Sequence, residues 1–135
     1  PNADYKLDIL DMPFPDGMFD FFICSHVLEH VADDAVAIKE LYRTTKRGGC
    51  GILMAPIIIG LEETLEVDPP VTDEAERWRL YGQGDHVRLY AHDDYVAKIK
   101  EGGFSVEQYD VGYFGVDVFA MLGLKSESVL YVAVK

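Results

Sequence analysis

The residues from His26 to His30 combine side chains that hold metal ions and move protons. With Glu29 between them, the two imidazoles form an H-x-x-E-H pattern. On one face of a long helix, such histidines bind zinc while the glutamate activates water for hydrolysis. A strand-like run precedes His26 and a helix cap follows at Asp33 or Asp34, so the flanking sequence does not favour that helix. We keep a zinc hydrolase as a remote alternative and expect no metal.

Ser25 and His26 mark the end of a run of large apolar residues that predicts a buried strand. Ligands of open parallel sheets bind beyond the carboxyl ends of the strands. An imidazole titrates near neutral pH and can take a proton from an attacking oxygen or nitrogen. We therefore predict that His26 is a catalytic base or orients the substrate, while a purely structural His26 stays open as the alternative.

A second group of polar and aromatic residues lies between positions 78 and 90. Such a mixture can hold a polar small molecule by stacking and hydrogen bonding, and the alternative is a loop pinned to the sheet by its own aromatic rings. The residues that we predict to bind substrate are His30, Tyr81, His86, Arg88 and Tyr90.

The elements that must position these residues alternate between strand and helix. Residues 19–25 are almost continuously apolar, which predicts a strand buried on both faces of a parallel sheet. A helix follows, with its cap at Asp33 or Asp34, Lys46 and Arg47 in its last turn, and its stop at Gly48-Gly49. Residues 50–55 predict the next buried strand, so the three elements form a right-handed crossover.

The second half of the chain begins with a long connection, residues 60–90, which holds one short predicted helix at 74–80. A connection of this length is usually a lid or a binding segment. Regular elements resume with a helix capped by Asp93 or Asp94 and stopped at Gly102-Gly103, then strands at 104–111 and 129–134. We find no repeat, and we expect residues 1–135 to form a single domain.

Composition excludes several classes of partner. The 12 basic and 24 acidic residues give a net charge of −12, which does not suit the phosphates of nucleic acid or of a membrane surface. No apolar run approaches the roughly 18 residues of a membrane span, so we expect a cytoplasmic location. Cys24 and Cys50 are too few for a disulfide framework, and we expect free thiols.

Five stretches occur together in an order typical of one enzyme family. The chain resembles the class I S-adenosylmethionine-dependent methyltransferases, specifically the small-molecule type 11 branch. Members of this branch carry D-x-x-x-L-P-F-x-D-x-x-F-D, then V-L-x-H-V, then E-x-x-R-x-L-K-P-G-G. The corresponding stretches here are Asp8 to Asp16, Phe19-Asp20, His26 to Val31, Glu40 to Arg43, and Lys46 to Gly49.

The resemblance implies an α/β fold, a partial Rossmann-like methyltransferase sheet that comprises the third to seventh strands. It would be a three-layer sandwich truncated at its N-terminal side. Residues 5–9 would be the end of the third strand, and residues 129–134 the antiparallel last strand, inserted between the fifth and sixth. The implied reaction is methyl transfer from S-adenosylmethionine to O, N or C of a small-molecule acceptor.

The resemblance also assigns residues to the cofactor. Asp8 and Ile9 would lie beside the adenine of S-adenosylmethionine, and Ser25 would border the cofactor at the strand tip. The family's glycine-rich cofactor loop has no counterpart in this sequence, so we expect the domain to be incomplete at its N-terminus and to bind no cofactor by itself. The alternative is a non-catalytic remnant or interaction module that keeps the scaffold.

The missing strands have a consequence for assembly. In the family, the first strand lies beside the fourth, so its absence leaves the edge of residues 19–25 open. An open strand edge is a template for pairing with another chain. We therefore expect a homodimer through this exposed sheet edge.

Overall fold

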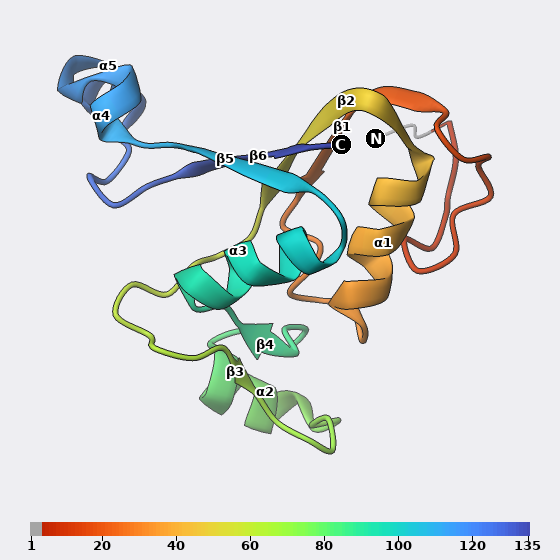
Figure 1. The fold of residues 1–135 in the computed structure, drawn as a ribbon. Helices are drawn as coiled ribbons and strands as arrows, with labels where there is room; N and C mark the ends of the chain where they lie inside the picture. Colours follow the sequence, from red (N-terminus) through yellow and green to blue (C-terminus); the bar gives the residue numbers. More distant parts are fainter. Residues whose placement is uncertain (1–3) are drawn as a thin grey trace.

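The computed structural model describes residues 4–135 and contains a four-stranded sheet (Figure 1). Its strands lie in the order β1 (Phe19–Ser25), β2 (Thr45–Met54), β6 (Leu130–Val134) and β5 (Ser105–Tyr109). β1 and β2 are parallel, whereas β6 runs antiparallel to β2 and β5. The partial Rossmann-like sheet is therefore confirmed, including its inserted antiparallel last strand.

Helix α1 (Asp34–Thr44) connects the two parallel strands. Its predicted cap is confirmed, since the carboxylate of Asp33 accepts a hydrogen bond from a first-turn backbone N–H at 3.0 Å. The predicted stop at Gly48-Gly49 is wrong, because α1 passes directly into β2 at Thr45. There the Thr45 hydroxyl donates to the carbonyl of Leu41 at 2.6 Å, which satisfies a last-turn carbonyl without a left-handed glycine.

Helix α3 (His92–Glu101) packs beside α1, and both cover the same face of the sheet (Figure 1). Ile38 of α1 and Ile99 of α3 are fully buried in the core between them. Gly102 permits this approach, because a Cβ at that position would overlap the side chain of Ile38. The core therefore lies between the two helices and one face of the sheet.

The opposite face of β1 is open. Phe21 and Ile23 are 50% and 66% exposed, so the prediction that this strand is buried on both faces is wrong. β1 is also the end strand of the sheet that the described residues form. The expected strand at residues 5–9 is not observed either, since only Asp8 takes part in a bridge, with Asp11 across a turn.

The connection between β2 and α3 contains β3 (Leu65–Glu66), α2 (Glu74–Tyr81) and β4 (Arg88–Leu89). The short helix is confirmed, whereas the β3–β4 pair was not predicted. The predicted cap at Asp93 or Asp94 is wrong, because α3 already begins at His92. The carboxylate of Asp94 instead accepts from the backbone N–H of Thr64 at 2.6 Å and holds the connection against the helix.

Two short helices, α4 (Val111–Phe114) and α5 (Val116–Leu122), were also not predicted, and Figure 1 shows them at the far end of β5 and β6. The two cysteines are free, as expected. Among the helices of residues 4–135, none has the length and apolar character needed to cross a membrane.

Candidate functional site

The carboxyl ends of β1 and β2 meet at the residues that follow Ser25 and Met54. The backbone N–H of His26 donates to the carbonyl of Met54 at 2.9 Å, which extends the pairing by one residue. Within residues 4–135, His26 is the one non-glycine residue with a positive φ, at 56°. Left-handed backbone at such a residue costs roughly 1–2 kcal/mol, and strain of this kind clusters at functional sites.

Ser25 holds the His26 ring at this tip. Its Oγ lies 2.9 Å from His26 Nδ1, and both side chains are exposed. If Nδ1 carries the ring proton, it donates to Oγ and Nε2 is left as a free acceptor. The pair can then remove a proton from a group that approaches the strand end.

The loop after His26 depends on the guanidinium of Arg88, which is 1% exposed. Its Nη1 donates to the carbonyls of Leu28 and Val31 at 2.7 Å each. Its Nη2 donates to the carbonyl of Ala32 at 3.1 Å and to Glu66 at 2.7 Å. Arg88 therefore ties the β3–β4 pair to the loop between β1 and α1.

Asp34, the first residue of α1, has three polar partners in the core. Its carboxylate accepts from the Tyr90 hydroxyl at 2.6 Å and from Lys98 Nζ at 2.9 Å, and it lies 3.6 Å from Arg88 Nε. Burial by itself would raise the pKa of Asp34, but the hydrogen bonds from Tyr90 and Lys98 and the charge of Arg88 outweigh it and lower the pKa. Asp34 is therefore held as a carboxylate.

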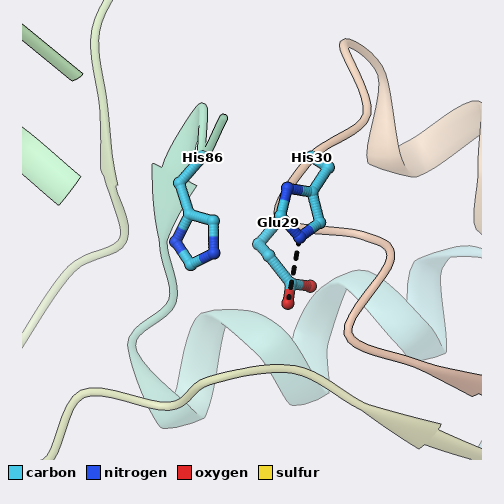
Figure 2. A group of neighbouring side chains, drawn as sticks. All are labelled: Glu29, His30 and His86. Atoms are coloured by element: carbon cyan, nitrogen blue, oxygen red, sulfur yellow. Dashed lines mark ion pairs between the residues drawn. The ribbon is translucent and has the colours of Figure 1, made fainter. Parts of the chain in front are cut away.

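The loop after β1 also carries part of a cluster of three side chains that face one another, Glu29, His30 and His86 (Figure 2). His30 Nε2 lies 3.8 Å from Glu29 Oε1, and the two imidazole rings are 4.8 Å apart at 77°. His30 Nδ1 lies 3.3 Å from the backbone carbonyl of Asp85. Burial, reinforced by the nearby His30, lowers the pKa of His86. The cluster thus joins the loop after β1 to a segment far along the sequence.

The predicted substrate residues divide into two sets. His30 and His86 come together in the cluster with Glu29. Tyr81, Arg88 and Tyr90 are buried, and protein groups engage the guanidinium of Arg88 and the hydroxyl of Tyr90. Both side chains hold the connection in place through these contacts. A substrate role for Tyr81, Arg88 and Tyr90 stays a prediction.

The residues assigned to the adenine lie in a turn ahead of β1. The Asp8 carboxylate accepts from the backbone N–H of Leu10 at 2.9 Å, which stabilises this turn. Arg43 anchors the segment between this turn and β1 by donating to the carbonyls of residues 12 and 14 at 3.0 and 2.7 Å. Ile9 lines an apolar hollow of about 500 Å³ beside β1. A cofactor role for Asp8, Ile9 and Ser25 stays a prediction.

The zinc hydrolase pattern does not have the geometry that this enzyme type requires. His26 lies in a bend and residues 28–32 form turns and bends, so no helix carries His26, Glu29 and His30. The two histidines are therefore not four residues apart on one helical face. Sequence reasoning named Asp34 only as a possible helix cap and gave Asp85 no role in the site, because their contacts are with residues more than 50 positions away.

Comparison with known proteins gives a family match in the first part of the chain, where the motifs lie. A family model described as a methyltransferase domain matches residues 2–53. The 27-O-demethylrifamycin SV methyltransferase of Amycolatopsis mediterranei is 30% identical over 100 residues, which are 74% of this chain and 34% of that protein. Ajmaline N-methyltransferase of Rauvolfia serpentina is 38% identical over 50 residues, which are 37% of this chain and 17% of that protein. The chain thus spans about a third or less of the length of these relatives.

Solved structures show the same fold. A chain in the complex between the Haloferax volcanii Trm112 methyltransferase activator and the putative methyltransferase superposes with a TM-score of 0.63 at 17% identity. The match covers 99% of this chain and 63% of that one. The Haemonchus contortus phosphoethanolamine N-methyltransferase 2 in complex with S-adenosyl-L-methionine gives a TM-score of 0.55 at 16% identity, over 95% of this chain and 36% of that one.

The parallel β1–α1–β2 unit and the inserted antiparallel β6 define a Rossmann-like methyltransferase sheet. The family match over residues 2–53 and the relatives above support a class I S-adenosylmethionine-dependent methyltransferase.

The structural role of Arg88 yields a stability prediction. Arg88→Met removes the cation beside Asp34 and the donor of three backbone carbonyls, so we expect the free energy of unfolding to decrease by about 3–5 kcal/mol. Arg79→Met is the matched control, because Arg79 is exposed on α2 and its ion pair is with Glu76, one turn away on the same helix. It should change the free energy by no more than about 0.5 kcal/mol in urea titrations. Equal effects of the two changes would contradict this role.

Asp34 yields a prediction about acid stability. Because its pKa in the folded protein lies below the ordinary 3.8, the carboxylate stabilises the fold above that pH, and this contribution is lost as the pH falls through the folded pKa. We expect Asp34→Asn to be less stable than the unchanged protein at neutral pH and to lose less stability between about pH 5 and about pH 2 in urea titrations. Asp117→Asn, at an exposed position, serves as the control. An unchanged acid profile of Asp34→Asn would refute the prediction.

Proposed function

We propose that this chain contributes the residues next to the methyl acceptor in a methyltransferase. The enzyme would transfer the methyl group of S-adenosylmethionine to O, N or C of a small molecule. The observation that carries the proposal is the strand order, with the polar Ser25–His26 pair at the carboxyl tip of β1. Ligands of such sheets bind beyond this tip. The family match over residues 2–53 supports the same reaction class.

The residues of this chain suit one part of S-adenosylmethionine, its adenine ring. Ile9, Ile23 and Val27 line one hollow with apolar walls, and such walls suit a flat adenine ring. When bound, S-adenosylmethionine supplies a methyl group on a positively charged sulfur, which leaves as a neutral thioether. An acceptor of negative or neutral charge then needs alignment more than activation.

His26 would act on the acceptor. With Nδ1–H donating to Ser25 Oγ, its Nε2 takes the proton that the acceptor oxygen or nitrogen loses as that atom bonds to the methyl carbon. The left-handed backbone at His26 ends the regular strand at this residue. For acceptors that carry no proton to lose, the same ring orients the substrate.

The proposal is tested in the protein that carries these residues, by methyl transfer from labelled S-adenosylmethionine to a panel of small acceptors. His26→Asn keeps a residue type that tolerates left-handed backbone and removes the base, so we expect kcat/KM to decrease roughly 100-fold or more. His92→Ala, at the start of α3, is the control and should leave kcat/KM unchanged. Activity of His26→Asn equal to that of the unchanged protein would remove His26 from the reaction, and absence of transfer with every acceptor would favour a non-catalytic interaction module.

Residues 1–135 studied by themselves should bind no measurable S-adenosylmethionine, because backbone amides of a glycine-rich loop and a ribose-binding acid are not among them. Calorimetric titration measures this affinity, and micromolar binding would contradict the prediction.

The same sample tests the homodimer that we propose through the open edge of β1. Light scattering should give the mass of two chains. The cytoplasmic location expected from the sequence stays a prediction.

A further inference from the structure

The geometry points to a metal site that is separate from the His26 base: we propose that Glu29, His30 and His86 bind one zinc ion. The three residues offer one carboxylate oxygen and two imidazole nitrogens, all within 4.8 Å of one another. Figure 2 shows the three side chains converging from the loop after β1 and from the segment before β4. This inference does not depend on the proposed methyl transfer.

Unpaired polar atoms are the first argument. Glu29 is 1% exposed, yet neither of its carboxylate oxygens accepts a hydrogen bond from any residue that the structure describes. The Nδ1 atom of His86 is buried without a partner in the same part of the chain. A buried carboxylate without compensation costs several kcal/mol, so such groups are paired or coordinate metals. In Figure 2 the His86 nitrogen that faces Glu29 is Nε2, so a cation between the two side chains would satisfy the carboxylate of Glu29.

Distances are the second argument. A tetrahedral zinc ion about 2.1 Å from each ligand sets the ligand atoms about 3.4 Å apart. The pair of His30 Nε2 and Glu29 Oε1, at 3.8 Å, is already close to this separation. The remaining separations lie within 4.8 Å, so closing the site requires each pair of ligand atoms to approach by at most about 1.4 Å.

The orientation of His30 is the third argument. Its Nδ1 lies 3.3 Å from the backbone carbonyl of Asp85 and 3.4 Å from the carboxylate of the same residue. Metal-binding histidines usually donate their second nitrogen to a carbonyl or a carboxylate, which fixes the ring and leaves the other nitrogen for the ion. The contact with Asp85 leaves His30 Nε2 directed at Glu29.

The two segments that carry the ligands are held together without the ion. The backbone N–H of Val87 donates to the carbonyl of Glu29 at 2.9 Å, next to His86. Arg88 then binds the carbonyls of Leu28 and Val31 on either side of the ligand pair. The ligands are therefore placed by the fold, which is what a defined site requires.

The donor set selects the metal. Two histidines and one glutamate are a set that zinc uses, whereas magnesium and calcium prefer oxygen ligands alone. Three protein ligands leave the fourth position to water or to an oxygen of a bound molecule. From the sequence we expected no metal, because the zinc hydrolase pattern requires a long helix around the motif. Here the motif lies in a turn, and a histidine from a distant segment completes the set of three ligands.

The test uses the full chain without a histidine tag, stripped with a chelator and titrated with zinc. We expect one zinc per chain and a rise in thermal stability with zinc. Glu29→Gln and His86→Ala should weaken zinc binding by more than roughly 100-fold, and Asp85→Asn by roughly 10- to 100-fold. His92→Ala, a histidine outside the cluster, should bind zinc as the unchanged chain does.

Three results would overturn the site: no saturable zinc binding, equal affinity of the His86→Ala and His92→Ala chains, or tighter binding of magnesium than of zinc. Circular dichroism establishes that each variant is folded. If the ligand variants do not fold, X-ray absorption on the zinc-loaded unchanged chain decides instead. Two imidazole ligands per zinc support the site, and any other number refutes it.

Discussion

One buried guanidinium, that of Arg88, determines how the long connection meets the sheet. Three carbonyls of the loop after β1 and the carboxylates of Asp34 and Glu66 surround it. Its charge is therefore compensated both by this loop and α1 and by β3. A cation this deeply buried is stable only where such acceptors are in place. The loop after β1 and the β3–β4 pair therefore form together, and the Arg88 contacts act with the hydrogen bond from Val87 N–H to the Glu29 carbonyl to bring His30 and His86 side by side.

The sheet could be predicted because its determinants are local or follow from the family resemblance. The apolar run at residues 19–25 and the capping aspartate at 33 depend on neighbours in the sequence, and both were located correctly. The end of α1 could not be predicted, because Lys46 to Gly49 have the residue types of a helix end. The side-chain hydrogen bond of Thr45 and the pairing of β2 with β1 outweigh that local preference.

The site residues were harder to predict, because a polar residue in a connection looks the same whether it faces a ligand or the core. Arg88 and Tyr90 have the types that bind substrates, but their partners Leu28 and Asp34 lie about 60 positions earlier. His86 was assigned to the substrate for the same reason. Glu29 was recognised in its motif, whereas its burial beside His86 depends on the closure of a long loop.

The parallel pairing of β2 with β1 limits how the length of the chain can change. Cys50 to Met54 pair with β1 in unbroken register, so a residue inserted before Ile52 would shift the strand by one position. Such a shift would move Leu53 from the core to the open face and Ile52 into its place. Ahead of Cys50 the register is irregular, and residues 46–49 can take up a change of length. Insertions and deletions in related sequences should therefore collect at residues 46–49 and in the β2–α3 connection and be excluded from residues 50–54.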